Sequence, residues 1–254
     1  MRYSAEPFLN PMPAAKRAER VAVDTLEICL NKLELNEVPL PVPVEEWIEH
    51  PLGFEFGVED LSHLGDGVLG ASYVEDGRIV VDESVTKHDG RFRFTAAHEL
   101  GHMLLHRKQR QVFTDSKQLV RGRDAQLERQ ADRFAAALLM PLHLVMKHLF
   151  TTCVSRKLDA QASISLNMPA TTESERLWRD TFIPSMTAAF GVSRAAAINR
   201  FLDIRLREDR ASFMPRRIAG SLRSRRAHNG DAEFAAQARR RTRQAPQPPE
   251  DLLL

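Results

Sequence analysis

Hydrophobic residues recur every three to four positions along four long stretches of the chain, which is the period of an amphipathic helix. The stretches cover residues 14–33, 91–107, 124–140 and 171–210. The second stretch has one apolar stripe, made of Phe92, Thr95, Ala96, Leu100, Met103 and Leu104. Pro184 and Gly191 interrupt the fourth stretch, so it is predicted to be helical with breaks.

Three shorter runs, at residues 54–58, 68–74 and 78–82, have the composition of β-strands. The last two are joined at Asp76-Gly77, a strong hairpin signal because both turn residues tolerate positive φ. Residues 107–123 are polar and irregular and are predicted to be a loop. The pattern therefore predicts an α+β fold, in which a small mixed or antiparallel sheet packs on helices and a helical C-terminal unit follows.

Charge divides the chain unevenly. The formal net charge is +2, yet from residue 215 onward nine arginines face four acidic residues, so this end carries +5 and the preceding part −3. The arginine clusters and the Pro-Gln-Pro-Pro ending predict a largely disordered tail. The expected organisation is an N-terminal arm at 1–16, a core at 17–150, a helical subdomain at 151–210 and an Arg-rich tail at 211–254.

Composition limits the cellular compartments in which the protein is expected. Hydrophobic residues make up 43% and charged residues 28%, as in globular proteins. Only Cys29 and Cys153 occur, which excludes a disulfide framework and fits a reducing compartment. Residues 1–13 lack the apolar stretch of a signal peptide, and the longest apolar run, 134–141, is too short to span a bilayer. The expected location is the cytoplasm, without a membrane partner.

The central motif is His98-Glu99-Leu100-Gly101-His102 in the second predicted helix. Residues four apart lie on one face of a helix, so His98 and His102 can reach one metal ion together. Zn²⁺ bound there would lower the pKa of a bound water to roughly 7. Glu99, one step round the helix, is the expected general base, which takes the proton and later passes it to the leaving amine.

A catalytic zinc needs a third protein ligand and an open position. Glu128 and Asp132 lie four apart on the next long helix, away from its apolar stripe. If that helix packs on the first, Glu128 points at the metal and Asp132 can accept the free N–H of a ligand imidazole. The plainer alternative is that Glu128 and Asp132 are solvated surface charges that bind no metal. Asp124 is another candidate ligand, although its place at the helix start favours a capping role.

Two segments of the chain resemble the ImmA/IrrE family of zinc metallopeptidases, which are gluzincin-like: residues 93–106, RFTAAHELGHMLLH, and residues 128–141, ERQADRFAAALLMP. The resemblance covers roughly residues 14–205. It implies one zinc ion per chain on His98, His102 and Glu128, with Glu99 catalytic, and a small mixed sheet beside the active-site helices. Members of this family commonly cleave or sequester transcriptional repressors in mobile elements, toxin–antitoxin loci or stress responses.

Other histidines have weaker claims on a metal. His106 continues the four-residue ladder, but it lies roughly 12 Å along the axis from His98, too far to share the ion. Packing or capping is its expected role. His143 and His148 have no motif support.

Two features could bind nucleic acid. A helix ending at Gly191 and a second helix capped by Ser193 resemble a helix-turn-helix unit. The second helix begins Arg-Ala-Ala-Ala, with little to touch base edges, so a structural unit is favoured over reading of the major groove. For the Arg-rich tail, a solvated segment is favoured over weak, salt-sensitive contact with nucleic acid.

The sequence therefore predicts a zinc-dependent endopeptidase with a protein substrate, expected to be a DNA-binding repressor with a helix-turn-helix. The alternative is a non-proteolytic regulator that binds a repressor or DNA through the same fold. The intact Glu99 favours the enzyme. We also expect one strand of the hairpin at 68–82 to border the active-site cleft and to pair with an extended substrate.

Overall fold

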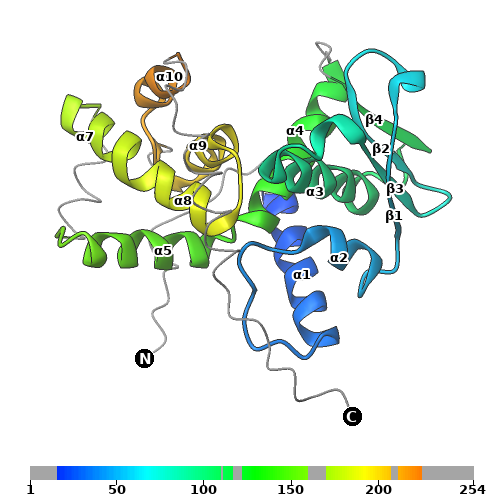
Figure 1. The fold of residues 1–254 in the computed structure, drawn as a ribbon, viewed down its shortest axis with the longest axis horizontal. Coiled ribbons are helices and arrows are strands. Elements are labelled where there is room, and N and C mark those ends of the chain that lie inside the picture. Colours follow the sequence, from blue (N-terminus) through cyan, green and yellow to red (C-terminus); the bar gives the residue numbers. More distant parts are fainter. Residues whose placement is uncertain (1–15, 110, 117–121, 160–169, 207–210, 225–254) are drawn as a thin grey trace, which may run out of the picture.

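The computed structural model describes residues 16–109, 111–116, 122–159, 170–206 and 211–224 (Figure 1). The helices of the first half are α1 (Lys16–Lys32), α2 (Val44–Glu49), α3 (Asp89–Leu105) and α4 (Gly122–Leu139). Its strands are β1 (Glu55–Glu59), β2 (Val68–Tyr73), β3 (Arg78–Asp82) and β4 (Val112–Ser116). The second half contains α5 (Leu142–Ser155), α7 (Thr172–Leu177), a π-helical turn (Trp178–Phe182), α8 (Ile183–Phe190), α9 (Arg194–Asp203), β5 (Arg205–Leu206), β6 (Ala211–Ser212) and α10 (Arg216–Ser224).

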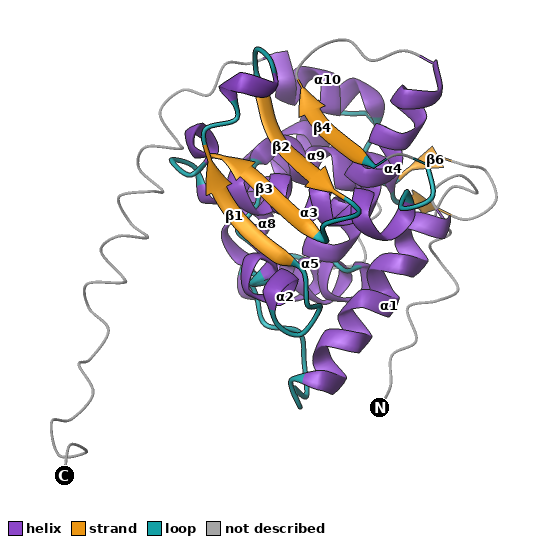
Figure 2. Ribbon diagram, turned by 90° about the vertical axis from the view of Figure 1, so that its right-hand side faces the viewer, coloured by secondary structure: helices purple, strands orange, loops and turns teal. Residues whose placement is uncertain are grey.

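The four-stranded sheet has the order β1-β3-β2-β4. Strand β1 runs parallel to β3, whereas β2 is antiparallel to both β3 and β4, so the sheet is mixed. Strands β2 and β3 form the predicted hairpin, and Gly77 in its turn has a φ of 65°. Helices lie behind one face of the sheet (Figure 2). The predicted α+β class, with a small mixed sheet on helices and a helical C-terminal part, is confirmed.

Helix α3 packs against β2 and β3 on one side and α4 on the other. An unbroken row of its side chains, from Thr95 to Met103, is buried. This burial explains why the helix lacks the solvent-facing polar stripe of a surface helix. The motif residues therefore sit inside the protein, between the sheet and α4.

Two expectations about the strands are wrong. Residues 107–123 were expected to form only a loop, but they contain β4, in which the side chain of Phe113 is buried. The hairpin does not supply a sheet edge either, because β2 and β3 are both interior and the edges are β1 and β4. A Pro substitution at Gly70 or Val80 would therefore break interior pairing instead of marking a substrate-binding edge.

The start of the predicted tail also needs correction. Residues 211–224 were assigned to a disordered tail, yet they form β6 and α10, with Phe213, Met214, Ile218 and Leu222 buried. Composition hid this helix, because the arginines flank an apolar face that packs near α9 and α7. The rest of the predicted tail, 225–254, lies outside the described residues, as do residues 1–15 of the predicted arm.

One hydrophobic cluster runs from Ala18 in α1 to Leu222 in α10 and includes side chains from both predicted domains. In Figure 1, α9 lies between the sheet-bearing half and the remaining C-terminal helices. The division at residue 150 stays a prediction. No single helix among the described residues is long and apolar enough to cross a membrane, although α4 and α5, which meet at a bend of 52°, pass that test together.

Candidate metal centre and active site

Helices α3 and α4 cross closely at Gly101. A Cβ atom at this position would lie 3.0 Å from the ring of Phe134 and 3.2 Å from the Cα atom of Ala131. Any larger residue would push the two helices apart. The glycine in the middle of the motif therefore allows α4 to reach the two histidines of α3.

At this crossing, three ligand atoms converge. His98 Nε2 and His102 Nε2 are 3.0 Å apart, and the Glu128 carboxylate lies 3.2 Å from the first and 3.5 Å from the second. A tetrahedral ion with metal–ligand bonds of 2.0–2.1 Å separates its ligand atoms by about 3.3 Å. The distance between the two imidazole nitrogens, and those from Glu128 Oε2 to His98 and from Glu128 Oε1 to His102, are all close to this value, so this cluster could hold a metal ion.

The electrostatics of Glu128 suit a ligand. Burial alone raises the pKa of its carboxyl group, but hydrogen bonds and charge from His102 and His98 outweigh burial and bring the pKa well below its usual range. Glu128 is therefore an anion at neutral pH, as metal binding requires. It is also only partly exposed, at 26% of its side-chain surface.

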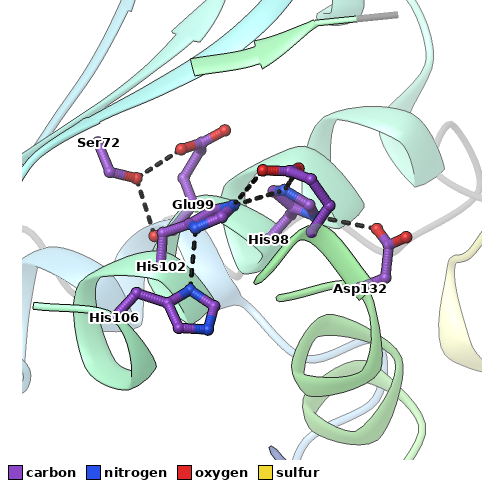
Figure 3. A network of polar contacts seen from close by, with 7 residues as sticks. Ser72, His98, Glu99, His102, His106 and Asp132 are labelled. Atoms are coloured by element: carbon purple, nitrogen blue, oxygen red, sulfur yellow. Dashed lines mark hydrogen bonds and ion pairs between the residues drawn. The ribbon is translucent and has the colours of Figure 1, made fainter. Parts of the chain in front are cut away.

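The outer nitrogens of both histidines have partners as well. His98 Nδ1 lies 3.0 Å from Asp132 Oδ1, and His102 Nδ1 lies 3.1 Å from His106 Nδ1 (Figure 3). The ring of Phe113, from β4, stacks on His102 with centroids 4.4 Å apart. Contacts of this kind fix the tautomer and the ring plane of a ligand imidazole.

His106 itself is fully buried. Burial, followed by the neighbouring His102, lowers the pKa of His106 to about 4. The ring is therefore neutral at physiological pH and can accept a hydrogen bond from His102. Its backbone N–H also caps α3 by donating to the carbonyl of His102.

Glu99 is buried beneath the sheet. The hydroxyl group of Ser72, on β2, lies 2.5 Å from Glu99 Oε2 and 2.9 Å from the carbonyl oxygen of Glu99. Figure 3 shows Ser72 beside the Glu99 carboxylate, with dashed lines to two oxygen atoms of Glu99. Glu99 is thus adjacent in sequence to one member of the cluster and is anchored to the strand above it.

Comparison with models of protein families identifies the family of this chain. A model of the peptidase M78 family, described as the IrrE N-terminal-like domain, matches residues 56–202. The chain belongs to this family. The match spans β1 to α9, including every residue of the site, and confirms the resemblance seen in the sequence. A search of curated proteins finds no match.

Membership of the M78 family supports a function of the metallopeptidase type. Of the other candidates from the sequence, Asp124 lies in the first turn of α4 and His143 is exposed on α5, and neither joins the cluster. His148 Nε2 lies 2.7 Å from Ser185 Oγ, at the contact of α5 with α8. These residues are not brought to the site.

Two residues that touch the site were missed in the sequence, Ser72 and Phe113. The signal for Ser72 was a polar residue at an inward position of a predicted strand. Phe113 is the one aromatic residue in a polar segment that was taken for a loop. In both cases the contact joins elements far apart in the chain.

The helix-turn-helix-like unit of the M78 chain has the expected local structure. Gly191 ends α8 in the left-handed region, and Ser193 caps α9. The guanidinium group of Arg93 in α3 donates to the carbonyl oxygen of Gly191 over 3.1 Å. Ala196 and Ala197, in the first turn of α9, are buried. This packing supports a structural role, since a recognition helix exposes its first turns to DNA.

Proposed function

We propose that this member of the M78 family is a zinc-dependent endopeptidase. The observation that carries the proposal is the group of three converging ligand atoms, with a buried glutamate, Glu99, on the same helix as the two histidines. Two imidazoles and one carboxylate form a ligand set of catalytic zinc sites, which keep a fourth position open. The spacing of the ligand atoms supports zinc over the larger, oxygen-preferring Ca²⁺.

In the proposed mechanism, His98, His102 and Glu128 hold the zinc ion. A zinc ion bound there would supply Lewis acidity, which lowers the pKa of a bound water and polarises a carbonyl group. Glu99 accepts a proton from the attacking water on its carboxylate and delivers it to the nitrogen of the leaving amine. Asp132 and His106 keep the Nδ1 atoms of the two ligand histidines engaged, which leaves Nε2 of each to bind a metal.

We propose that an extended substrate pairs with strand β4. Val74 N donates to Gln111 O over 2.8 Å, and bonded positions alternate in an antiparallel pair. The backbone N–H and C=O groups of Val112 and Thr114 therefore point to the outer edge of the described sheet. Phe113, between them, contacts His102, so this edge lies next to the metal cluster. Main-chain pairing of this kind tolerates many side chains.

The proposed substrate is a cytoplasmic DNA-binding regulator with a helix-turn-helix. Strand pairing requires a flexible, extended segment, which a folded repressor exposes in a linker. Cleavage near the boundary of its DNA-binding domain is expected, with slow or no cleavage of tightly folded proteins. Comparing the cleaved peptides of cells that express wild-type protein and the Glu99→Gln variant would identify the substrate.

Purified wild-type protein and Glu99→Gln provide the biochemical test, with an unfolded protein such as reduced casein as the substrate. The wild type should contain zinc and cleave; Glu99→Gln should retain zinc and lose at least about 100-fold in rate, as for removal of a general base. Zinc-loaded wild-type protein that cuts neither casein nor any protein in cells would favour a non-proteolytic regulator. A fully active Glu99→Gln would refute the assigned role of Glu99.

A further inference from the structure

Strand β2 crosses α3 directly above Glu99. Gly70 and Ser72 share one face of β2, because side chains alternate along a strand. Ala71, between them, packs on the opposite face with Leu61 and Val80. The face of β2 toward the helix therefore carries Gly70, which has no side chain, and Ser72, which has a small hydroxyl-bearing side chain.

Ser72 contacts Glu99 at two atoms. The distances of 2.5 Å to the carboxylate and 2.9 Å to the carbonyl oxygen are both short enough for hydrogen bonds. A hydroxyl group that donates to a carboxylate forms a strong, short bond, typically of 2.5–2.7 Å. Because Ser72 and Glu99 are both fully buried, water does not compete for this contact.

Gly70 makes room for the same side chain. A Cβ atom at position 70 would lie 2.6 Å from Glu99 Oε1 and 2.8 Å from Glu99 Cγ, and 2.9 Å from the methyl group of Thr95. Real Cβ atoms do not approach other atoms this closely. Glycine weakens a strand and commonly marks a close approach. Here the close approach is that of the carboxylate of Glu99.

We infer that Ser72 is a positioning residue for Glu99, and that Gly70 provides the space in which Glu99 is held. The inference rests on the proposed role of Glu99 as the base. The bond from Ser72 fixes the direction of the carboxylate before substrate binds, since a base acts only from a defined position. Ser72 touches none of the metal-binding atoms, so its loss should lower kcat and leave zinc binding unchanged.

The test compares Ser72→Ala, Ser72→Thr and Ser72→Val, using the casein-derived peptide that the wild type cleaves best. Threonine and valine have nearly the same shape and differ in the hydroxyl group. The expected result for Ala and Val is a fall in kcat of about 10–100-fold, with KM and zinc content within about threefold of wild type. Thr should recover most of the lost kcat, which a role in packing alone does not predict.

Gly70→Ala provides an independent readout. Crystal structures of this variant should show the Glu99 carboxylate displaced from its place beneath β2, with kcat lowered as well. Gly57→Ala is the matched control, because a Cβ atom at Gly57, also in a strand, would meet its nearest atoms at 3.7 Å. Gly57→Ala should leave both kcat and the Glu99 position unchanged.

Failure of the role of Ser72 and failure of the proposed function give different results. Full activity of Ser72→Ala, alongside an inactive Glu99→Gln, would overturn the inference and leave the proposed function intact. Equal losses in the Thr and Val variants, or a parallel loss of zinc, would also overturn it. An active Glu99→Gln would instead refute the role of Glu99 as the base, on which the inference rests, whereas a zinc-loaded wild type that cleaves nothing would refute the proposed function itself.

Discussion

At the scale of single residues, both ring nitrogens of His98 and of His102 are engaged. Each Nε2 atom faces the other ligand atoms, while each Nδ1 atom faces a partner, Asp132 or His106. Such partners raise the basicity of a ligand imidazole and hold its orientation. Metal affinity should therefore depend on side chains that never touch the metal.

Asp132→Ala should weaken zinc affinity by about 10–100-fold without abolishing binding. The lost contact is the one from His98 Nδ1 to the carboxylate. Asp132→Asn keeps a hydrogen-bond acceptor and should lose less. Competition with a chelator of known affinity measures the effect. Unchanged affinity in the alanine variant would show that Asp132 is merely a solvated charge.

The site residues that could be predicted from the sequence are those that lie close together along the chain. His98 and His102 lie about one helical turn apart, so their shared face, with Glu99 one step round it, follows from helix geometry. Glu128 and Asp132 also share one turn, and the chemistry required a third ligand. Ser72 is 27 residues from Glu99, and the register of a strand over a helix decides their contact.

At the scale of elements, β4 is the sheet edge beside the metal cluster, and β1 is the opposite edge. Local turn chemistry correctly predicted the hairpin of β2 and β3. The order of strands could not be predicted in the same way, because it depends on long-range pairing. Strand β4 itself has only a short apolar run, Val112-Phe113, within a polar segment.

Thr114→Pro should lower turnover about 10-fold or more, because it removes an outward N–H of β4 that the substrate would use. The ladder to β2 should survive, and zinc content should stay normal. Val58→Pro is the matched control. Glu55 N bonds to Gly77 O across the parallel pair, so the N–H of Val58 also points outward, but at the far edge. Equal turnover in the two variants would contradict strand pairing at β4.

At the scale of the whole molecule, the C-terminal helices and the sheet-bearing half share buried contacts. The guanidinium group of Arg200, in α9, is fully buried. It donates to the carbonyl oxygen of Met140 at the end of α4 and pairs with the carboxylate of Glu19 in α1. Loss of Glu19 or Arg200 would leave the other charge buried without a partner, which is destabilising. Through these contacts α9 holds α1 and the end of α4, the helix that carries Glu128.

Truncation should distinguish the folded part of the C-terminus from the rest. A chain that ends at Arg210 loses the buried side chains of Phe213, Met214, Ile218 and Leu222, each contributing about 1.5–3 kcal/mol, and should melt at least about 10 °C lower. A chain that ends at Ser224 should melt near wild type. Leu222→Ala should lower the free energy of unfolding by about 2–5 kcal/mol. This full-length variant tests the packing of α10 even if the shorter chain does not fold. Equal melting temperatures for all these proteins would show that α10 does not pack.

The prediction of a disordered tail from residue 211 failed at α10 for a physical reason. A segment with nine arginines in forty residues has the composition of a disordered tail, but the spacing of Ile218, Ala219 and Leu222 places these residues on one helix face. That face is apolar, and the rest of the core provides a surface for it. Average composition conceals such a local pattern.

The most direct test of the central claim is the zinc content of purified protein, measured by mass spectrometry for wild type, His102→Ala and His143→Ala. We predict one zinc ion per chain in the wild type and in His143→Ala, whose exposed ring lies outside the cluster. His102→Ala should lose most of its zinc, because a ligand atom is removed. Stoichiometric zinc in His102→Ala, or none in the wild type, would contradict the assignment of His98, His102 and Glu128 as the metal centre.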